Sequence, residues 1–159
     1  MKVTLSVIKA DIGSIGGHVK PSEKLVEAVK TYVSENGKNL IKDFYVSFTG
    51  DDVAILFSHT LGKNNPEIHK LAWDAFIEGT RIAKIQGLYG AGQDLLKSSF
   101  SGNVRGMGPA VCELEFKERP NEPFLFFAAD KTEPGAYNLP VYLMFADPMN
   151  TPGLLLSPS

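Results

Sequence analysis

Residues 43–59, D-F-Y-V-S-F-T-G-D-D-V-A-I-L-F-S-H, hold the pattern on which the fold depends. Both halves, 43–49 and 53–59, are rich in aromatic and β-branched side chains, which favour extended strands. The residues between them, Gly50-Asp51-Asp52, are types that tight turns prefer. The segment therefore predicts a β-hairpin that carries two acidic side chains at its turn.

Three further segments have the character of strands. Residues 2–10 place apolar side chains on one face at alternate positions, and residues 110–117 alternate between apolar and charged side chains. The second pattern predicts a strand with one hydrated face and places the single cysteine, Cys112, in the core. Residues 124–129, F-L-F-F-A-A, are apolar throughout and predict a strand that is buried on both faces.

Two helices are expected between these strands. Ser22 is a favourable N-cap for a helix with an apolar stripe at helical spacing, and Asn36-Gly37 ends that helix. Pro66 opens a second amphipathic helix, which Gly87 ends. The resulting order, β-α-β-β-α-loop-β-β, predicts an α/β (α+β) fold with antiparallel strand pairs, in a single domain over residues 1–159.

The bulk composition excludes several classes of protein. The chain has 159 residues, 43% of them hydrophobic and 21% charged, with a formal net charge of −2. These values are typical of one globular domain, and the absence of a basic stripe argues against nucleic acid as a partner. No apolar run reaches the ~20 residues that span a membrane, and a single cysteine suits a reducing compartment. We therefore expect a cytoplasmic protein with no membrane partner.

Acidic and amide side chains follow four strand or turn segments. They are Asp11, Asp51-Asp52, Gln93-Asp94 and Asp130, and His18 follows Asp11 in a glycine-rich loop. Carboxylates are costly to gather unless a cation neutralises them. If the fold brings these segments together, it creates an oxygen-rich site for hard divalent cations, Mg²⁺ above all. Because adjacent residues of an extended chain point to opposite sides, the acidic pair would ligate two separate ions.

Each of these features also has a purely structural interpretation. Acidic residues are common in tight turns, and a histidine in a glycine-rich loop is as often a surface residue as a ligand. His59 and His69 are assigned to the fold, because one ends an apolar strand and the other lies in an amphipathic helix.

Residues 88–109 form a long glycine-rich stretch. Such stretches inside a compact domain more often have a function than serve only as a connection. Within it, F-S-G-N-V-R-G-M-G (100–108) frees several backbone amides and would cradle a phosphate. It is neither a Walker loop nor a dinucleotide fingerprint. Lys131 beside Asp130 adds a cation that suits a phosphate bridging to a metal ion.

Taken together, these sequence motifs resemble those of the archaeal and deep-branching bacterial fructose-1,6-bisphosphate aldolase/phosphatase family. The resemblance runs in order over essentially the whole chain. It is carried by S-V-I-K-A-D-I-G-S (6–14), G-G-H (16–18), G-D-D (50–52), L-Y-G-A-G-Q-D-L-L (88–96), S-F-S-G-N-V-R-G-M-G-P (99–109), A-D-K-T-E-P-G-A-Y-N-L-P (129–140) and F-A-D-P-M-N-T-P-G (145–153).

The resemblance implies a bifunctional gluconeogenic enzyme. Such an enzyme condenses dihydroxyacetone phosphate with glyceraldehyde 3-phosphate and then, with several Mg²⁺ ions, hydrolyses the 1-phosphate of fructose 1,6-bisphosphate. It also implies a layered α-β-β-α sandwich with mixed, largely antiparallel sheets, assembled as a homo-octamer.

The resemblance also assigns roles to individual residues. It gives Asp11 the acid/base role of the phosphatase step. The implied metal ligands are Asp11, His18, Asp51, Asp52, Gln93 and Asp130. The implied substrate contacts are His18, Tyr89, Gly102, Asn103 and Lys131.

This sequence also departs from the family pattern. Family members are about twice as long or more, and their Schiff-base lysine, its tyrosine partner and a further acidic pair lie beyond residue 159. We therefore expect an incomplete sandwich, a chain cut short after T-P-G-L-L-L (151–156), and no aldolase activity from this chain alone. The alternative function is a truncated, non-catalytic sugar-phosphate-binding or assembly module.

Overall fold

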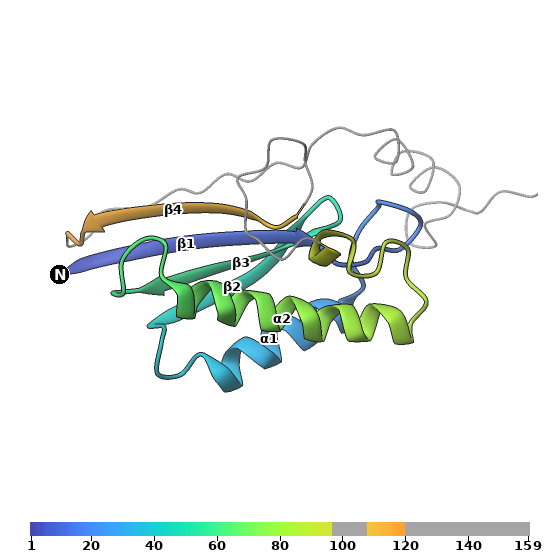
Figure 1. The fold of residues 1–159 in the computed structure, drawn as a ribbon, viewed down its shortest axis with the longest axis horizontal. Helices are drawn as coiled ribbons and strands as arrows, with labels where there is room; N and C mark the ends of the chain where they lie inside the picture. The colour runs from blue at the N-terminus through green and yellow to red at the C-terminus, as the bar shows by residue number, and fades with distance from the viewer. Residues whose placement is uncertain (97–107, 120–159) are drawn as a thin grey trace, which may run out of the picture.

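The computed structural model describes residues 1–96 and 108–119 (Figure 1). The helices and strands predicted within these ranges are confirmed, with bounds shifted by no more than a residue or two, whereas the strand predicted at 124–129 lies outside them. In chain order the elements are β1 (Lys2–Asp11), α1 (Glu23–Asn36), β2 (Asp43–Thr49), β3 (Asp52–His59), α2 (Pro66–Ile85), the 3-10 turn η1 (Gln93–Leu96) and β4 (Ala110–Lys117).

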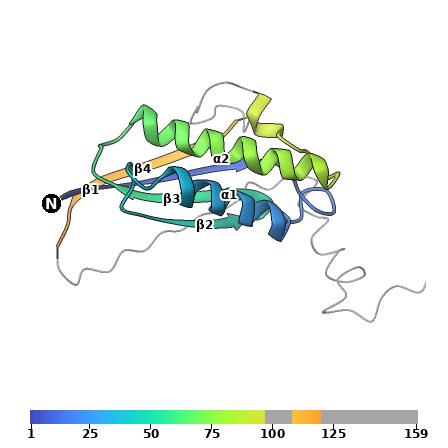
Figure 2. The same cartoon turned by 90° about the horizontal axis from the view of Figure 1, so that it is seen from below.

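The four strands form one open antiparallel sheet in the order β2-β3-β1-β4. Both helices pack against the same face of this sheet (Figures 1 and 2). The predicted hairpin places β2 beside β3, and β1 lies in the centre between β3 and β4. The described residues are therefore mixed α/β, with one helical layer and one sheet.

The core lies between the helices and the sheet. Ile8 of β1, Phe57 of β3 and Phe76 of α2 are fully buried there, as part of a larger apolar cluster. The helices begin where their caps predict. The Ser22 hydroxyl accepts a hydrogen bond from the Leu25 N–H, and such a cap satisfies a backbone donor that has no partner inside the helix.

The prediction for β4 is wrong about which side chains are buried. Cys112 is exposed and Leu114 is 47% exposed, whereas the Glu113 side chain is almost fully buried. The strand register explains the inversion. Glu113 pairs with Ser6 on the helix side of the sheet, where its carboxylate accepts hydrogen bonds from the Ser6 hydroxyl and the His69 ring. Cys112 and Leu114 consequently lie on the face turned away from the helices.

That second face of the sheet is apolar over much of its area. Leu5 pairs with Leu114, Val3 pairs with Phe116, and Tyr45 of β2 is 66% exposed. An apolar sheet face of this kind is suited to packing against another layer. The predicted α-β-β-α sandwich would place its second sheet here, and among residues 1–96 and 108–119 only one half of that arrangement is present. No helix in these ranges is both long enough and apolar enough to cross a membrane.

Candidate metal centre

Segments far apart in sequence meet at one end of the sheet. The end of β1, the following loop, the turn between β2 and β3, and the segment that leads into η1 all lie at this end (Figure 1). The β1–β3 register places Asp11 directly opposite Asp52, and Asp51 occupies the turn. The β1–β3 pairing and the hairpin turn thus bring three carboxylates into one region, as the sequence predicts.

The loop after β1 carries His18 into this region. Three successive residues, Gly16, Gly17 and His18, adopt left-handed backbone conformations with φ of 67°, 66° and 61°. Glycine adopts this conformation freely, but a histidine there costs on the order of 1 kcal/mol. The Ser14 hydroxyl accepts a hydrogen bond from the His18 N–H at 3.0 Å and so helps to stabilise the loop. Strain of this kind concentrates at functional sites.

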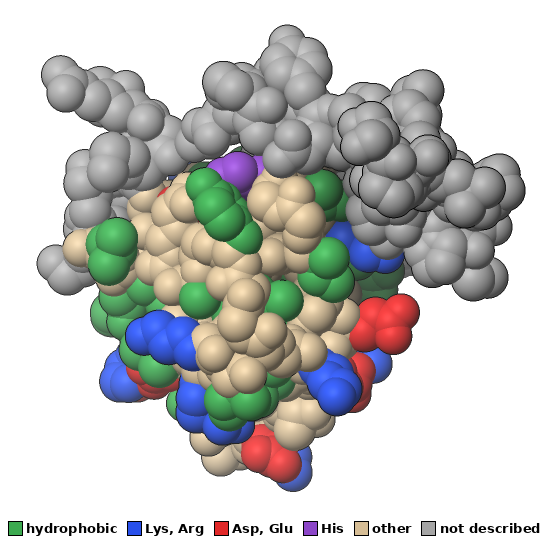
Figure 3. Space-filling model, turned by 90° about the vertical axis from the view of Figure 1, so that its right-hand side faces the viewer, with side chains coloured by type: hydrophobic (Ala, Val, Ile, Leu, Met, Phe, Trp, Pro, Cys, Tyr) green, Lys and Arg blue, Asp and Glu red, His purple; other side chains and the backbone are tan. Residues whose placement is uncertain are grey.

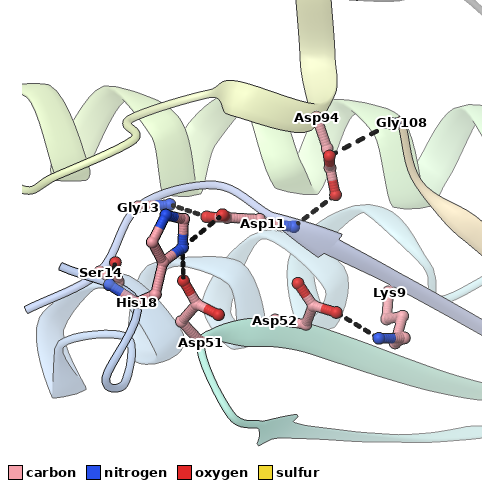
Figure 4. A network of polar contacts seen from close by, with 9 residues as sticks. All are labelled: Lys9, Asp11, Gly13, Ser14, His18, Asp51, Asp52, Asp94 and Gly108. Atoms are coloured by element: carbon pink, nitrogen blue, oxygen red, sulfur yellow. Dashed lines mark hydrogen bonds and ion pairs between the residues drawn. The ribbon is translucent and has the colours of Figure 1, made fainter. Parts of the chain in front are cut away.

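The His18 ring lies between two buried carboxylates (Figure 4). Its Nδ1 is 2.7 Å from Oδ2 of Asp51 and 3.6 Å from Oδ2 of Asp11. One ligand atom from each of the three residues lies within 4.8 Å of the others, so together they could hold a metal ion. Two carboxylate oxygens and one imidazole nitrogen are an appropriate donor set for a divalent cation.

The electrostatics of this cluster oppose full ionisation of Asp11. Burial, and then the neighbouring charges of Asp51, Asp52 and Asp94, raise the pKa of Asp11 from 3.8 to about 7, against the opposite effect of His18. Crowded carboxylates of this kind lose their mutual repulsion when a cation binds between them. The cluster is therefore electrostatically prepared for a positive charge.

Asp52 contacts a different partner from Asp51. Its carboxylate binds the Lys9 ammonium group, whereas the Asp51 carboxylate contacts His18 (Figure 4). The two adjacent aspartates therefore engage separate groups, Asp51 from the turn and Asp52 from the first residue of β3. That they ligate two separate ions stays a prediction. Sequence reasoning missed Lys9, although its position two residues before Asp11 in a strand places both side chains on the same face.

Two predicted residues of the 88–96 segment also reach the cluster. The Tyr89 ring meets the His18 ring edge to face, with centroids 4.9 Å apart. The Gln93 and Asp11 side chains both lie near Gly90, since a Cβ atom there would be 3.2 Å from Gln93 Oε1 and 3.8 Å from Asp11 Oδ1. Sequence reasoning did not give Asp94 a role, yet its carboxylate accepts a hydrogen bond from the Asp11 N–H at 2.8 Å.

The remaining predicted residues lie outside the described ranges. They are Gly102, Asn103, Asp130 and Lys131, and their roles stay predictions. Figure 3 views the molecule onto the end that carries the cluster. Histidine surface is visible there at the border with the residues that are not described, and the exposed acidic and basic side chains lie mainly below it.

Sequence comparison gives an independent result for the whole chain. The sequence profile of a family described as Fructose-1,6-bisphosphatase matches residues 2–159. Among curated proteins, the chain is 62% identical to the fructose-1,6-bisphosphate aldolase/phosphatase of Thermus thermophilus, over 99% of this chain and 44% of that protein. It is 60% identical to the protein of the same name from Cenarchaeum symbiosum, over 100% of this chain and 42% of that protein.

A relative of the same name from Sulfurisphaera tokodaii is 53% identical, over 100% of this chain and 42% of that protein. The chain therefore spans less than half the length of the curated relatives that it matches.

Proposed function

The chain belongs to the fructose-1,6-bisphosphatase family, and we propose that it forms the phosphatase centre of a fructose-1,6-bisphosphate aldolase/phosphatase. The substrate would be fructose 1,6-bisphosphate, the cofactor Mg²⁺, and the setting cytoplasmic gluconeogenesis. The observation that carries this proposal is the convergence of Asp11, His18 and Asp51, whose ligand atoms lie within 4.8 Å of one another.

The residues of this cluster suit phosphate monoester hydrolysis. Asp11, His18 and Asp51 would hold one divalent cation, and Asp52 and Gln93, with Asp130, would serve further ions. A cation bound there supplies positive charge against the phosphate in the transition state.

The Asp11 carboxyl group would accept the proton of the attacking water. In the metal-free protein burial and the neighbouring carboxylates raise its pKa to about 7, and a cation bound beside it would lower that pKa and keep the carboxylate ionised, as a base requires. His18 would be held in position by its contacts with Asp51 and the Tyr89 ring. Phosphate contacts from Gly102, Asn103 and Lys131 complete the proposed site.

The test is release of inorganic phosphate from fructose 1,6-bisphosphate by the native protein, with and without Mg²⁺. We expect release only with Mg²⁺, and a loss of about 100-fold or more in Asp51→Asn, because that variant lacks a ligand. Asp74→Asn is the matched control, since Asp74 is an acidic residue on α2 paired with Lys70 at the surface. Release that is insensitive to chelator and to Asp51→Asn would contradict the proposal.

The length of the chain supports one alternative. The chain spans 40–44% of the length of its relatives, and the alternative is that it binds a sugar phosphate or takes part in assembly without turnover. We propose that residues 1–159 contain no Schiff-base lysine for the aldolase reaction on dihydroxyacetone phosphate, and that the native protein is a homo-oligomer. Binding of fructose 1,6-bisphosphate with no Mg²⁺-dependent phosphate release would favour the alternative.

A further inference from the structure

Asp94 links two strand ends through a single carboxylate. Its Oδ2 accepts a hydrogen bond from the Asp11 N–H at 2.8 Å, and its Oδ1 accepts one from the Gly108 N–H at 3.2 Å (Figure 4). Asp11 is the last residue of β1, and Gly108 lies two residues before β4 begins. A side chain from a third segment therefore connects the two strands beyond their last paired residues.

The strand register explains why a carboxylate is suited to this position. The final β1–β4 pair joins Lys9 to Ala110, so continuation of the same register would place Asp11 opposite Gly108. At that position the strands no longer pair with each other, and both backbone N–H groups instead donate to Asp94. The carboxylate offers one acceptor oxygen to each donor, so both hydrogen bonds depend on an acidic residue.

The segment that carries Asp94 is held to the loop after β1 by backbone hydrogen bonds. Ser14 and Tyr89 exchange two backbone hydrogen bonds of 2.9 and 3.0 Å, and the Gly92 N–H donates to the Ile12 carbonyl at 3.1 Å. Within the turn, the Gln93 N–H donates to the Gly90 carbonyl at 2.8 Å. The carboxylate therefore projects from a segment that is fastened to the residues following Asp11.

The location of this contact has a consequence for the metal cluster. The Asp11 backbone is fixed on one side by its pairing with Asp52 and on the other side by Asp94. Its carboxylate faces His18, with Oδ2 3.6 Å from the ring Nδ1. Loss of the Asp94 contact would free one side of the backbone that carries the Asp11 carboxylate, and small displacements of a ligand are costly.

From this geometry we propose that Asp94 is a positioning residue, whose carboxylate holds the end of β1 so that Asp11 faces His18 and Asp51. The inference rests on the proposed phosphatase function, because it assigns Asp94 to the same site. In this role Asp94 acts on the cation site through the position of Asp11. Placing a further carboxylate beside Asp11 has an electrostatic cost, which a neutral hydrogen-bonding residue would avoid.

The test compares wild-type protein with Asp94→Asn and Asp94→Glu in the full-length protein. An asparagine presents an amide N–H₂ group to one of the two backbone donors, so it loses one hydrogen bond at nearly constant size. We expect Asp94→Asn to weaken Mn²⁺ binding, measured by electron paramagnetic resonance, by about 10-fold or more, and to lower kcat similarly. The KM for fructose 1,6-bisphosphate should stay within about 3-fold of wild type.

Asp94→Glu tests the role of the carboxylate separately from folding. It keeps both acceptor oxygens on a side chain longer by one methylene, so we expect it to recover part of the Mn²⁺ affinity lost in Asp94→Asn. Glu78→Gln is the matched control, because Glu78 is an acidic residue on α2 that pairs with Arg81. The control should retain wild-type Mn²⁺ affinity and kcat.

Two outcomes would overturn the inference in distinguishable ways. If wild-type protein binds Mn²⁺ and releases phosphate, and Asp94→Asn matches it in both or loses both only in proportion to its unfolded fraction, the inference alone is wrong. If wild-type protein neither binds Mn²⁺ nor releases phosphate, the proposed function fails, and the role of Asp94 fails with it.

Discussion

Asp11 is a buried carboxyl group beside three other carboxylates. It is 5% exposed, and its pKa is raised to about 7 by burial and then by Asp51, Asp52 and Asp94. Because the folded-state pKa is above the unfolded value of 3.8, the folded protein holds a proton that the unfolded chain releases between these pH values. In the metal-free protein the contribution of Asp11 to stability therefore falls as pH rises from about 4 to about 7.

The substitution Asp11→Asn should remove the repulsion between the ionised Asp11 carboxylate and its neighbours. We expect it to raise the melting temperature of the metal-free protein at pH 8, where the wild-type carboxylate is ionised, and to change it little at pH 4. Differential scanning calorimetry in the presence of a chelator measures both values, with Asp74→Asn as the surface control. An unchanged or lowered melting temperature for Asp11→Asn at pH 8 would show that the cluster is not electrostatically strained.

At the scale of single residues, the sequence predicts the members of the cluster better than their connections. Asp11, His18 and Asp51 are recognisable because each follows a strand or glycine-rich turn. Lys9 was not predicted, and Asp94 was named but given no role, since their partners depend on strand register and on where a distant segment docks. A short-range pattern contains neither kind of information.

At the scale of elements, local chemistry predicts boundaries but not always faces. Ser22 and Pro66 begin helices as expected, because caps and proline act on adjacent backbone. The alternation in β4 suggests that Cys112 is buried and Glu113 hydrated, and the structure shows the reverse. The deciding partners of Glu113 are Ser6 and His69, which come from β1 and α2 and were not visible as partners in the sequence.

His59 of β3, Ser6 of β1 and Glu113 of β4 form a chain of hydrogen bonds across three strands, in which the donor of each bond can be assigned. The Leu61 N–H donates to His59 Nδ1 at 3.2 Å, which leaves the ring proton on Nε2 to donate to the Ser6 hydroxyl at 2.8 Å. Ser6 in turn donates to Glu113 at 2.7 Å. Protonation of His59 would therefore break the Leu61 contact. Burial lowers the pKa of His59 below 6.5, against the opposing charge of Glu113, and the neighbouring His69 lowers it further.

The lowered pKa predicts a loss of stability in acid. Since the unfolded chain binds a proton at His59 more readily than the folded protein, the contribution of His59 to stability falls as pH drops below about 6.5, by at most about 1.4 kcal/mol per pH unit. Asp11 acts in the opposite direction over part of this range, so the His59 contribution is the difference between wild type and a His59 variant. Urea unfolding at pH 7.5 and pH 5.5 measures the change, and His59→Gln should show a smaller change than wild type. An equal change in both proteins would indicate that His59 does not contribute.

At the level of the whole molecule, the main feature is the open face of the sheet. Among the described residues, no second layer of helices or strands packs against it (Figure 1). Leu114 and its neighbours on β1 form an apolar surface opposite the helices. The sequence predicted a four-layer sandwich through family resemblance alone, because strand periodicity in the described part indicates only one sheet. The second sheet therefore remains a prediction.

The sandwich predicts that Leu114 is buried in the complete protein. We expect Leu114→Gln to lower the free energy of unfolding by about 2 kcal/mol, because it places an amide against an apolar layer. Ile77→Gln on α2 is the matched control, since Ile77 is 50% exposed and Leu114 is 47% exposed, and it should change stability by about 0.5 kcal/mol or less. Equal effects of the two substitutions in urea unfolding would argue against a second layer.

Asp11, His18 and Asp51 are expected to bind one divalent cation together. Anomalous X-ray diffraction from crystals of the native protein grown with Mn²⁺ tests it most directly, because the ion scatters anomalously and its ligands can be read from the map. We expect an anomalous peak within ligand distance of the Asp11 and Asp51 carboxylates and the His18 ring, and its loss in Asp51→Asn crystals. Ordered Mn²⁺ found only elsewhere, or none at saturating concentration, would contradict it.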